Sequence, residues 1–197
     1  MAQAYVQLIK NVSRRGSILI GGWSFGGILA VHIAQILNNE TKAPRVAGII
    51  LIDSVYPTRL RHGLDMDLQE NIVAGVVAEL KDKHPVSLVR STYLRYARQL
   101  PSWNNCATGI CRAHMSVPFS VTLIRAGSRI PMANPQETSF LDWTRSMPHL
   151  GWENYQGDFI SQVLETPGNH FSIFDTPNLL STTSSIRDAL KAFRKVL

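Results

Sequence analysis

A serine flanked by glycines, between two apolar runs, is the feature that most restricts how this chain can fold. Gly22-Trp23-Ser24-Phe25-Gly26 has the pattern G-x-S-x-G. The run SILI at residues 17–20 predicts a buried strand before it, and ILAVHIAQIL at residues 28–37 predicts a buried helix after it. A strand that turns sharply into a helix at such a serine is a nucleophile elbow. The alternative is a glycine-rich turn with an incidental serine.

Aspartates that follow predicted strands are candidates for the acid that orients a catalytic histidine. Asp53 comes directly after the apolar run at residues 46–52. Asp142 follows a predicted strand at residues 121–126 after a loop, and Asp158 is a weaker third candidate. Sites in open α/β sheets form at the carboxyl ends of strands, which favours Asp53. The residues alone leave Asp142 as its main competitor, and Asp53 could also merely cap a turn.

His170 is the candidate general base. It lies in the sequence TPGNHF, a rigid turn after a strand predicted at residues 159–164. His32 falls on the buried helix and is interpreted as structural. The other histidines fall in loops or helical segments, without a strand end to fix them: His62, His84, His114 and His149. A general base needs a hydroxyl to deprotonate and an acid to orient it. The candidates for these three roles follow one another in the chain in the order Ser24, Asp53, His170.

The order of predicted elements indicates a single α/β domain over residues 1–197. Strand, helix and strand between residues 17 and 52 form a right-handed βαβ unit. Residues 57–118 carry no strand signal and contain helical stretches, so we expect an inserted helical lid there. Amphipathic helices are predicted at both ends, residues 2–11 and 186–197. Their expected apolar faces are Tyr5, Leu8, Ile9 and Val12 in the first and Ile186, Leu190, Phe193 and Leu197 in the second.

Composition argues against several classes of protein. The net charge of +6 comes from scattered basic residues rather than a dense basic stripe, which disfavours nucleic acid and suits an anionic protein partner. Cys106 and Cys111 alone form neither a disulfide framework nor a metal site, and we expect reduced thiols in a cytoplasmic protein. No apolar run reaches 18 residues and the first residues lack a signal-peptide core, so we expect no membrane association.

Four separated motifs, GGWSFGG, LIDSVYP, GWENY and TPGNHFSIF, together resemble the thioesterase domain that ends polyketide synthases and nonribosomal peptide synthetases, most closely the fungal polyketide synthases. The resemblance implies an α/β-hydrolase fold: a mostly parallel sheet with helices on both faces and an inserted helical lid. It also implies that Ser24 is the nucleophile, His170 the base and Asp53 rather than Asp142 the acid. The N–H of Phe25, at the start of the helix, is the expected oxyanion donor.

The sequence departs from this family at its start. Family members carry several strands before the elbow strand, and a loop that completes the oxyanion hole, whereas only 16 residues precede the strand here. We therefore expect a fold that lacks the first strands. The chain is then either a truncated piece of a larger domain or synthase, or a short gene product with impaired activity.

The resemblance implies release of a polyketide or peptide acyl chain from the phosphopantetheine thioester of a carrier protein, by hydrolysis or cyclisation. No cofactor or metal is expected beyond that arm, and the expected partners are an acyl carrier protein or synthase domains. Two alternatives stay open: a carboxylester hydrolase that acts on diffusible substrates, and an inactive hydrolase-like module that acts by binding.

Overall fold

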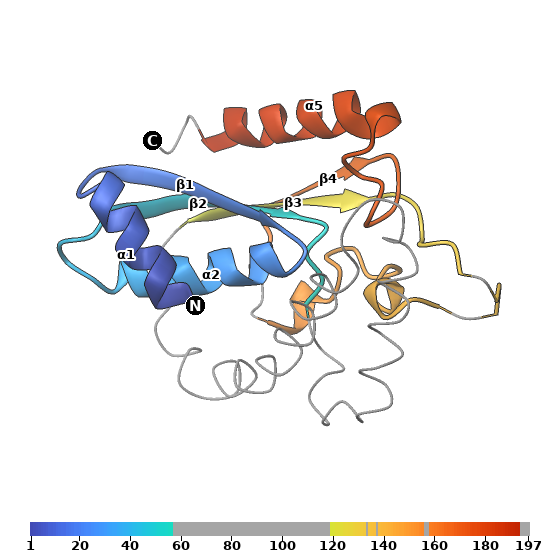
Figure 1. Ribbon diagram of the computed structural model, residues 1–197, viewed down its shortest axis with the longest axis horizontal. Coiled ribbons are helices and arrows are strands. Elements are labelled where there is room, and N and C mark those ends of the chain that lie inside the picture. The colour runs from blue at the N-terminus through green and yellow to red at the C-terminus, as the bar shows by residue number, and fades with distance from the viewer. Residues whose placement is uncertain (57–118, 133, 137, 156–157, 194–197) are drawn as a thin grey trace.

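The computed structural model describes residues 1–56 and 119–193, apart from residues 133, 137, 156 and 157. The lid predicted at residues 57–118 lies outside the described residues. Within them, a parallel sheet separates two helical layers (Figure 1).

In the part of the chain that the structure describes, four strands form the sheet, in the order β1-β2-β3-β4, and each neighbouring pair is parallel. Parallel strands place their carboxyl ends at one edge, so the segments that follow β1, β2, β3 and β4 can meet there. The strands are β1 (Ser17–Trp23), β2 (Arg45–Ile52), β3 (Ser120–Ala126) and β4 (Gln162–Thr166).

Helices cover both faces of this sheet. α2 (Phe25–Asn38) packs on β1 and β2, with α1 (Ala2–Val12) beside it, and α5 (Thr176–Phe193) lies across the opposite face (Figure 1). Two short 3₁₀ helices, η3 (Phe140–Asp142) and η4 (Trp152–Asn154), lie between β3 and β4 in the chain. The predicted α/β fold, with a parallel sheet and helices on both faces, is confirmed.

The first helix forms where the sequence predicts it but buries a different face. Ala2 and Val6 are buried in the core, and Ile9 packs partly against it. Tyr5, Leu8 and Val12 are exposed, although the periodicity placed them on the buried face. Ala2, Val6 and Ile9 also have helical spacing, and α1 presents this stripe because it packs against α2.

α5 and β4 begin at other residues than predicted. α5 starts at Thr176, ten residues before residue 186, and its Leu190 is exposed. β4 starts at Gln162 because Phe159 stacks on Trp152 with ring centroids 5.1 Å apart, outside the strand. Phe159 thus packs against Trp152 in the segment before β4 and is not part of the strand.

The core beneath α5 depends on the close approach of the Phe193 ring to the backbone of Gly48 in β2. Phe193 and Ala189 are buried against Ile50 and Ile124 of the sheet. A Cβ at Gly48 of β2 would lie 2.5 Å from the Phe193 ring and 2.9 Å from a methyl carbon of Leu19. The helix can therefore seat its aromatic ring only where the strand has no side chain.

Replacing Gly48 with alanine tests this packing. We expect Gly48→Ala to lower the free energy of unfolding by about 1–3 kcal/mol, because the added methyl overpacks the core. Urea denaturation followed by circular dichroism measures it. Gly127→Ala is the matched control, since the three atoms nearest to its added Cβ would belong to the flexible Glu165 side chain, the nearest at 3.1 Å. Equal stability of the two variants would contradict the packing account.

Candidate active site

Ser24 occupies a strained turn between β1 and α2. Its backbone has φ 56° and ψ −125°, a conformation that costs a non-glycine residue roughly 1–3 kcal/mol. A Cβ at Gly22 would lie 2.1 Å from the carbonyl carbon of Gly26, so the first glycine of the motif is sterically required. A Cβ at Gly26 would meet nothing within 4 Å. The close approach of strand and helix therefore rests on Gly22.

Bonds from the neighbouring strand hold this turn in place. The Ser24 N–H donates to the Ile52 carbonyl at 2.9 Å, and the Ser54 hydroxyl donates to the Ser24 carbonyl at 2.6 Å. Trp152 in turn donates from Nε1 to the Ser54 carbonyl at 2.7 Å. The end of β2 and the indole of η4 thus fix the backbone of the elbow, and with it the direction of the Ser24 hydroxyl.

Asp53 follows β2 directly and its side chain is fully buried. Its N–H donates to the Ile124 carbonyl at 2.7 Å, and the Ala126 N–H donates to Asp53 Oδ1 at 2.8 Å. Both contacts come from β3, the next strand of the sheet. The parallel register therefore fixes backbone and carboxylate together at the carboxyl edge.

His170 joins the other two residues from the loop after β4. Its Nδ1 lies 2.8 Å from Asp53 Oδ2, and its Nε2 lies 3.0 Å from Ser24 Oγ. Because a carboxylate only accepts hydrogen bonds, Nδ1 carries the ring hydrogen and Nε2 can accept the serine proton. The structure thus brings together Ser24, Asp53 and His170.

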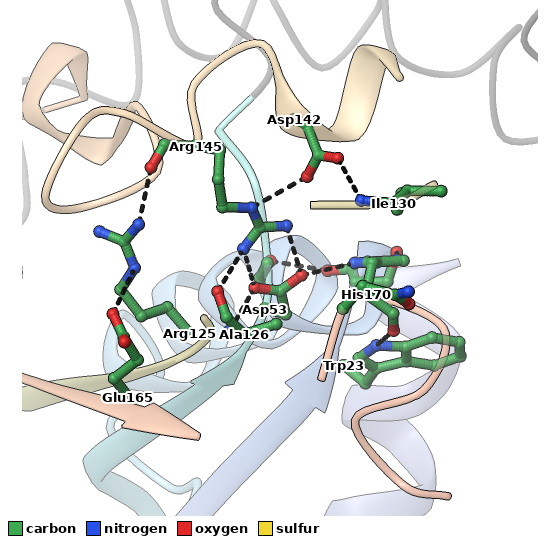
Figure 2. A network of polar contacts seen from close by, with 12 residues as sticks. Trp23, Asp53, Arg125, Ala126, Ile130, Asp142, Arg145, Glu165 and His170 are labelled. Atoms are coloured by element: carbon green, nitrogen blue, oxygen red, sulfur yellow. Dashed lines mark hydrogen bonds and ion pairs between the residues drawn. The ribbon is translucent and has the colours of Figure 1, made fainter. Parts of the chain in front are cut away.

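Two local features fix the imidazole. Trp23 stacks on it with ring centroids 5.1 Å apart, and its Nε1 donates to the His170 carbonyl at 3.2 Å (Figure 2). The Asn169 side chain accepts hydrogen bonds from the N–H groups of Phe171 and Ser172 at 2.9 and 3.0 Å. Such a turn, closed by an asparagine side chain, restricts the backbone on either side of His170.

Sequence reasoning missed Arg145, which forms a two-pronged ion pair with Asp53. Its Nη1 bonds Asp53 Oδ1, its Nη2 lies 2.9 Å from Asp53 Oδ2, and its Nε lies 2.9 Å from Asp142 Oδ1 (Figure 2). Arg145 lies in the segment after η3, and the only sequence signal was its i,i+3 spacing from Asp142. That spacing does not reveal a contact with a strand end 92 residues away.

The remaining predicted candidates take other positions. Asp142 is buried and bonds Arg145 rather than His170, and Asp158 is exposed. His149 lies 3.9 Å from Glu153, while His32 is half-buried on α2. Phe25 opens α2 directly after Ser24, as the oxyanion prediction requires. The structure does not describe the other three histidine candidates: His62, His84 and His114.

The surroundings of Asp53 favour its ionised form. Burial is the largest influence and by itself would raise the pKa of this carboxyl. Hydrogen bonds and charge from Arg145, together with the hydrogen bond to His170, outweigh burial and hold the pKa of Asp53 well below its ordinary value. Asp53 is therefore a carboxylate at neutral pH, able to accept a hydrogen bond from the N–H at His170 Nδ1.

Within the ranges that the structure describes, no three histidine, cysteine, aspartate or glutamate side chains are grouped so that they could hold a metal ion. Nor is any helix in those ranges long and apolar enough to cross a membrane.

A parallel sheet covered by helices, with a serine at the strand–helix turn and a histidine and an aspartate at neighbouring strand ends, defines the α/β-hydrolase class. Residues 1–186 match the model of the thioesterase domain family. The chain belongs to that family.

Individual relatives agree with this assignment. Thioesterase frbD of Dothideomycetidae sp. (strain 11243) is 34% identical over 193 residues, which cover 96% of this chain and 70% of that protein. An orsellinic acid synthase of Beauveria bassiana (strain ARSEF 2860) is 30% identical over an alignment 232 residues long, which covers 98% of this chain but 10% of the synthase. The solved NocB thioesterase domain, in covalent complex with a fluorophosphonate nocardicin G analog, shares the fold with a TM-score of 0.62 at 21% identity. That match covers 96% of this chain and 74% of the NocB chain.

The lowered pKa of Asp53 predicts how stability depends on pH. Its stabilising contribution is complete above the unfolded-state pKa of about 3.9, and is lost as the pH falls through that value toward the folded-state pKa, because only the unfolded state takes up the proton. We expect Asp53 to lower the free energy of unfolding by up to about 1.4 kcal/mol for each unit by which the pH falls in this range.

Urea denaturation at a series of pH values between about 5 and 3 measures this decline. Asp53→Asn should show a shallower decline than the wild type. Asp188→Asn, which removes a half-exposed carboxylate on α5, should keep the wild-type slope. An Asp53→Asn slope equal to that of the wild type would show that the ionised carboxylate does not stabilise the folded state.

Proposed function

We propose that the chain is a serine thioesterase that releases an acyl chain from the phosphopantetheine thioester of a carrier protein, through an acyl-Ser24 intermediate. The observation that carries the proposal is the hydrogen-bonded series Ser24 Oγ, His170 Nε2, His170 Nδ1 and Asp53 Oδ2, at 3.0 and 2.8 Å, in a chain of the thioesterase domain family.

In the first half of the reaction, Ser24 Oγ attacks the thioester carbonyl carbon while His170 Nε2 takes the hydroxyl proton. Asp53 stabilises the imidazolium that forms. The Phe25 N–H, at the positive end of α2, donates to the oxyanion. The C–S bond then breaks, and His170 returns its proton to the departing thiolate.

In the second half, His170 takes a proton from water, or from a hydroxyl or acidic carbon within the acyl chain, as this nucleophile attacks the acyl-Ser24 carbonyl. Collapse of the intermediate breaks the ester bond and returns the proton to Ser24 Oγ. Water gives hydrolysis, and an internal nucleophile gives cyclisation. The same three side chains serve both outcomes, so the release mode depends on which nucleophile reaches the ester.

A tethered substrate and a macromolecular partner fit this reaction. The net charge of +6 suits an acidic carrier protein, and a similar segment lies within a protein named orsellinic acid synthase. A carrier-bound substrate arrives at high effective concentration, so tight binding of the acyl chain itself is not required. We propose an acyl carrier protein or synthase domain as the partner and a polyketide-like chain as the substrate. The chemistry needs no other cofactor, and the cytoplasmic location stays a prediction.

Substitution of the serine tests the proposal. A fluorophosphonate should label the wild type stoichiometrically, and peptide mass spectrometry should place the label on Ser24. Ser24→Ala should fold normally, take up no label and lose about 10⁴- to 10⁶-fold in turnover of an acyl-pantetheine thioester. Ser181→Ala, on the exposed side of α5, is the control and should behave like the wild type.

The alternatives predict other results. A carboxylester hydrolase would turn over the matched oxygen ester better than the acyl-pantetheine thioester. An inactive binding module would take up no label at all. Labelling retained in Ser24→Ala would exclude Ser24 as the nucleophile.

A further inference from the structure

Arg145 connects the two aspartates that compete in the sequence for the role of acid. Two of its nitrogens bond both oxygens of Asp53, and its Nε lies 2.9 Å from Asp142 Oδ1. All three side chains are at least nine-tenths buried, with the arginine side chain 4% exposed. Figure 2 shows the guanidinium between the two carboxylates, with His170 beyond Asp53.

Backbone groups hold this arrangement at both ends. The Ile130 N–H donates to Asp142 Oδ2 at 2.7 Å, so both oxygens of Asp142 are engaged. Arg145 Nη1 also donates to the Ala126 carbonyl at 3.1 Å. Burial alone would lower the pKa of Arg145, but the two aspartates outweigh it and raise that pKa, so the guanidinium stays charged.

The charges of this buried cluster do not cancel in the resting state. Asp53 and Asp142 contribute −2 and Arg145 contributes +1, so the cluster carries −1 when His170 is neutral. It becomes neutral when His170 accepts the Ser24 proton. Without Asp142 the same step would take the cluster from neutral to +1, which costs more in a low-dielectric interior.

We propose that Arg145 and Asp142 are positioning residues of the reaction: Arg145 holds the Asp53 carboxylate toward His170, and Asp142 offsets the arginine charge so that His170 accepts a proton into a cluster of net charge −1. The inference rests on the proposed function, because it assigns His170 the role of base. It explains why an aspartate that does not touch the histidine is buried beside the arginine.

The groups packed around the cluster are compatible with this charge balance. Trp23 and Phe171 contribute uncharged rings against His170. Arg125 of β3 donates to the Arg145 carbonyl at 2.6 Å, and its own Nε lies 3.7 Å from a carboxylate oxygen of Glu165 on β4. This second arginine therefore has its own counter-ion.

The test is the pH dependence of the rate at which a fluorophosphonate labels Ser24, which falls at acidic pH as the base is protonated. Arg145→Gln removes a positive charge, and should move the midpoint of the acidic limb up by about half a pH unit or more. Asp142→Asn removes a negative charge, and should move it down by a similar amount. Arg145→Lys keeps the positive charge but loses the two-nitrogen contact of the guanidinium with Asp53. It should have the wild-type midpoint and be labelled more slowly.

Two exposed substitutions match the charge changes. Lys191→Gln and Asp188→Asn alter an ion pair on α5 whose side chains are 63% and 50% exposed, and should leave the midpoint unchanged. Shifts of the midpoint in opposite directions in Arg145→Gln and Asp142→Asn support the proposal. Midpoints equal to those of the controls would overturn it, even if labelling slowed, since slower labelling alone fits a structural role.

Circular dichroism and thermal melts establish which variants fold. If Arg145→Gln does not fold because Asp53 loses its counter-ion, Asp142→Asn decides the question alone, because Arg145 and Asp53 stay paired in it. Failure of both neutral variants to fold would overturn the proposal in favour of a purely structural pair. A wild type that takes up no label would instead overturn the proposed function itself.

Discussion

The site depends on one fully buried carboxylate. Among the described residues, four hydrogen bonds reach the Asp53 carboxylate: two from Arg145, one from His170 and one from the Ala126 N–H. An unpaired carboxylate in this position would be neutralised by burial, and a neutral acid would not stabilise an imidazolium. The arginine and the backbone donor thus keep the charge that the histidine needs, in the orientation in which the histidine can use it.

The parallel sheet brings these groups together from distant parts of the chain. Ser24 follows β1, Asp53 follows β2, Ala126 ends β3 and His170 lies just beyond β4, so each strand delivers one member to the same edge. The elbow is strained, and bonds from the end of β2 hold it there. Helices pack on both faces of this sheet, and Phe193 of α5 is buried against it where Gly48 has no side chain.

Much of this arrangement could be predicted because it follows from local sequence patterns. The G-x-S-x-G turn between two apolar runs predicted the elbow, and Asp53 and His170 were candidates because each follows a strand signal. Only the family resemblance decided for Asp53 over Asp142. Arg145 could not, because no period or motif ties a loop arginine to a strand end 92 residues earlier. The start of α5 was missed because weak helix formers, Ser and Thr, make up five of its first nine residues. β4 was misplaced because Phe159 packs against Trp152 instead of joining the strand.

The central claim is that Asp53, and not Asp142, stabilises the protonated histidine, while Asp142 acts only through Arg145. Measuring kcat/KM for an acyl-pantetheine thioester with Asp53→Asn and with Asp142→Asn tests it most directly. We expect a loss of about 10⁴-fold for Asp53→Asn and about tenfold for Asp142→Asn. The larger loss is expected because His170 would take the wrong tautomer and its imidazolium would not be stabilised. Equal losses, or the larger loss at Asp142, would contradict this account.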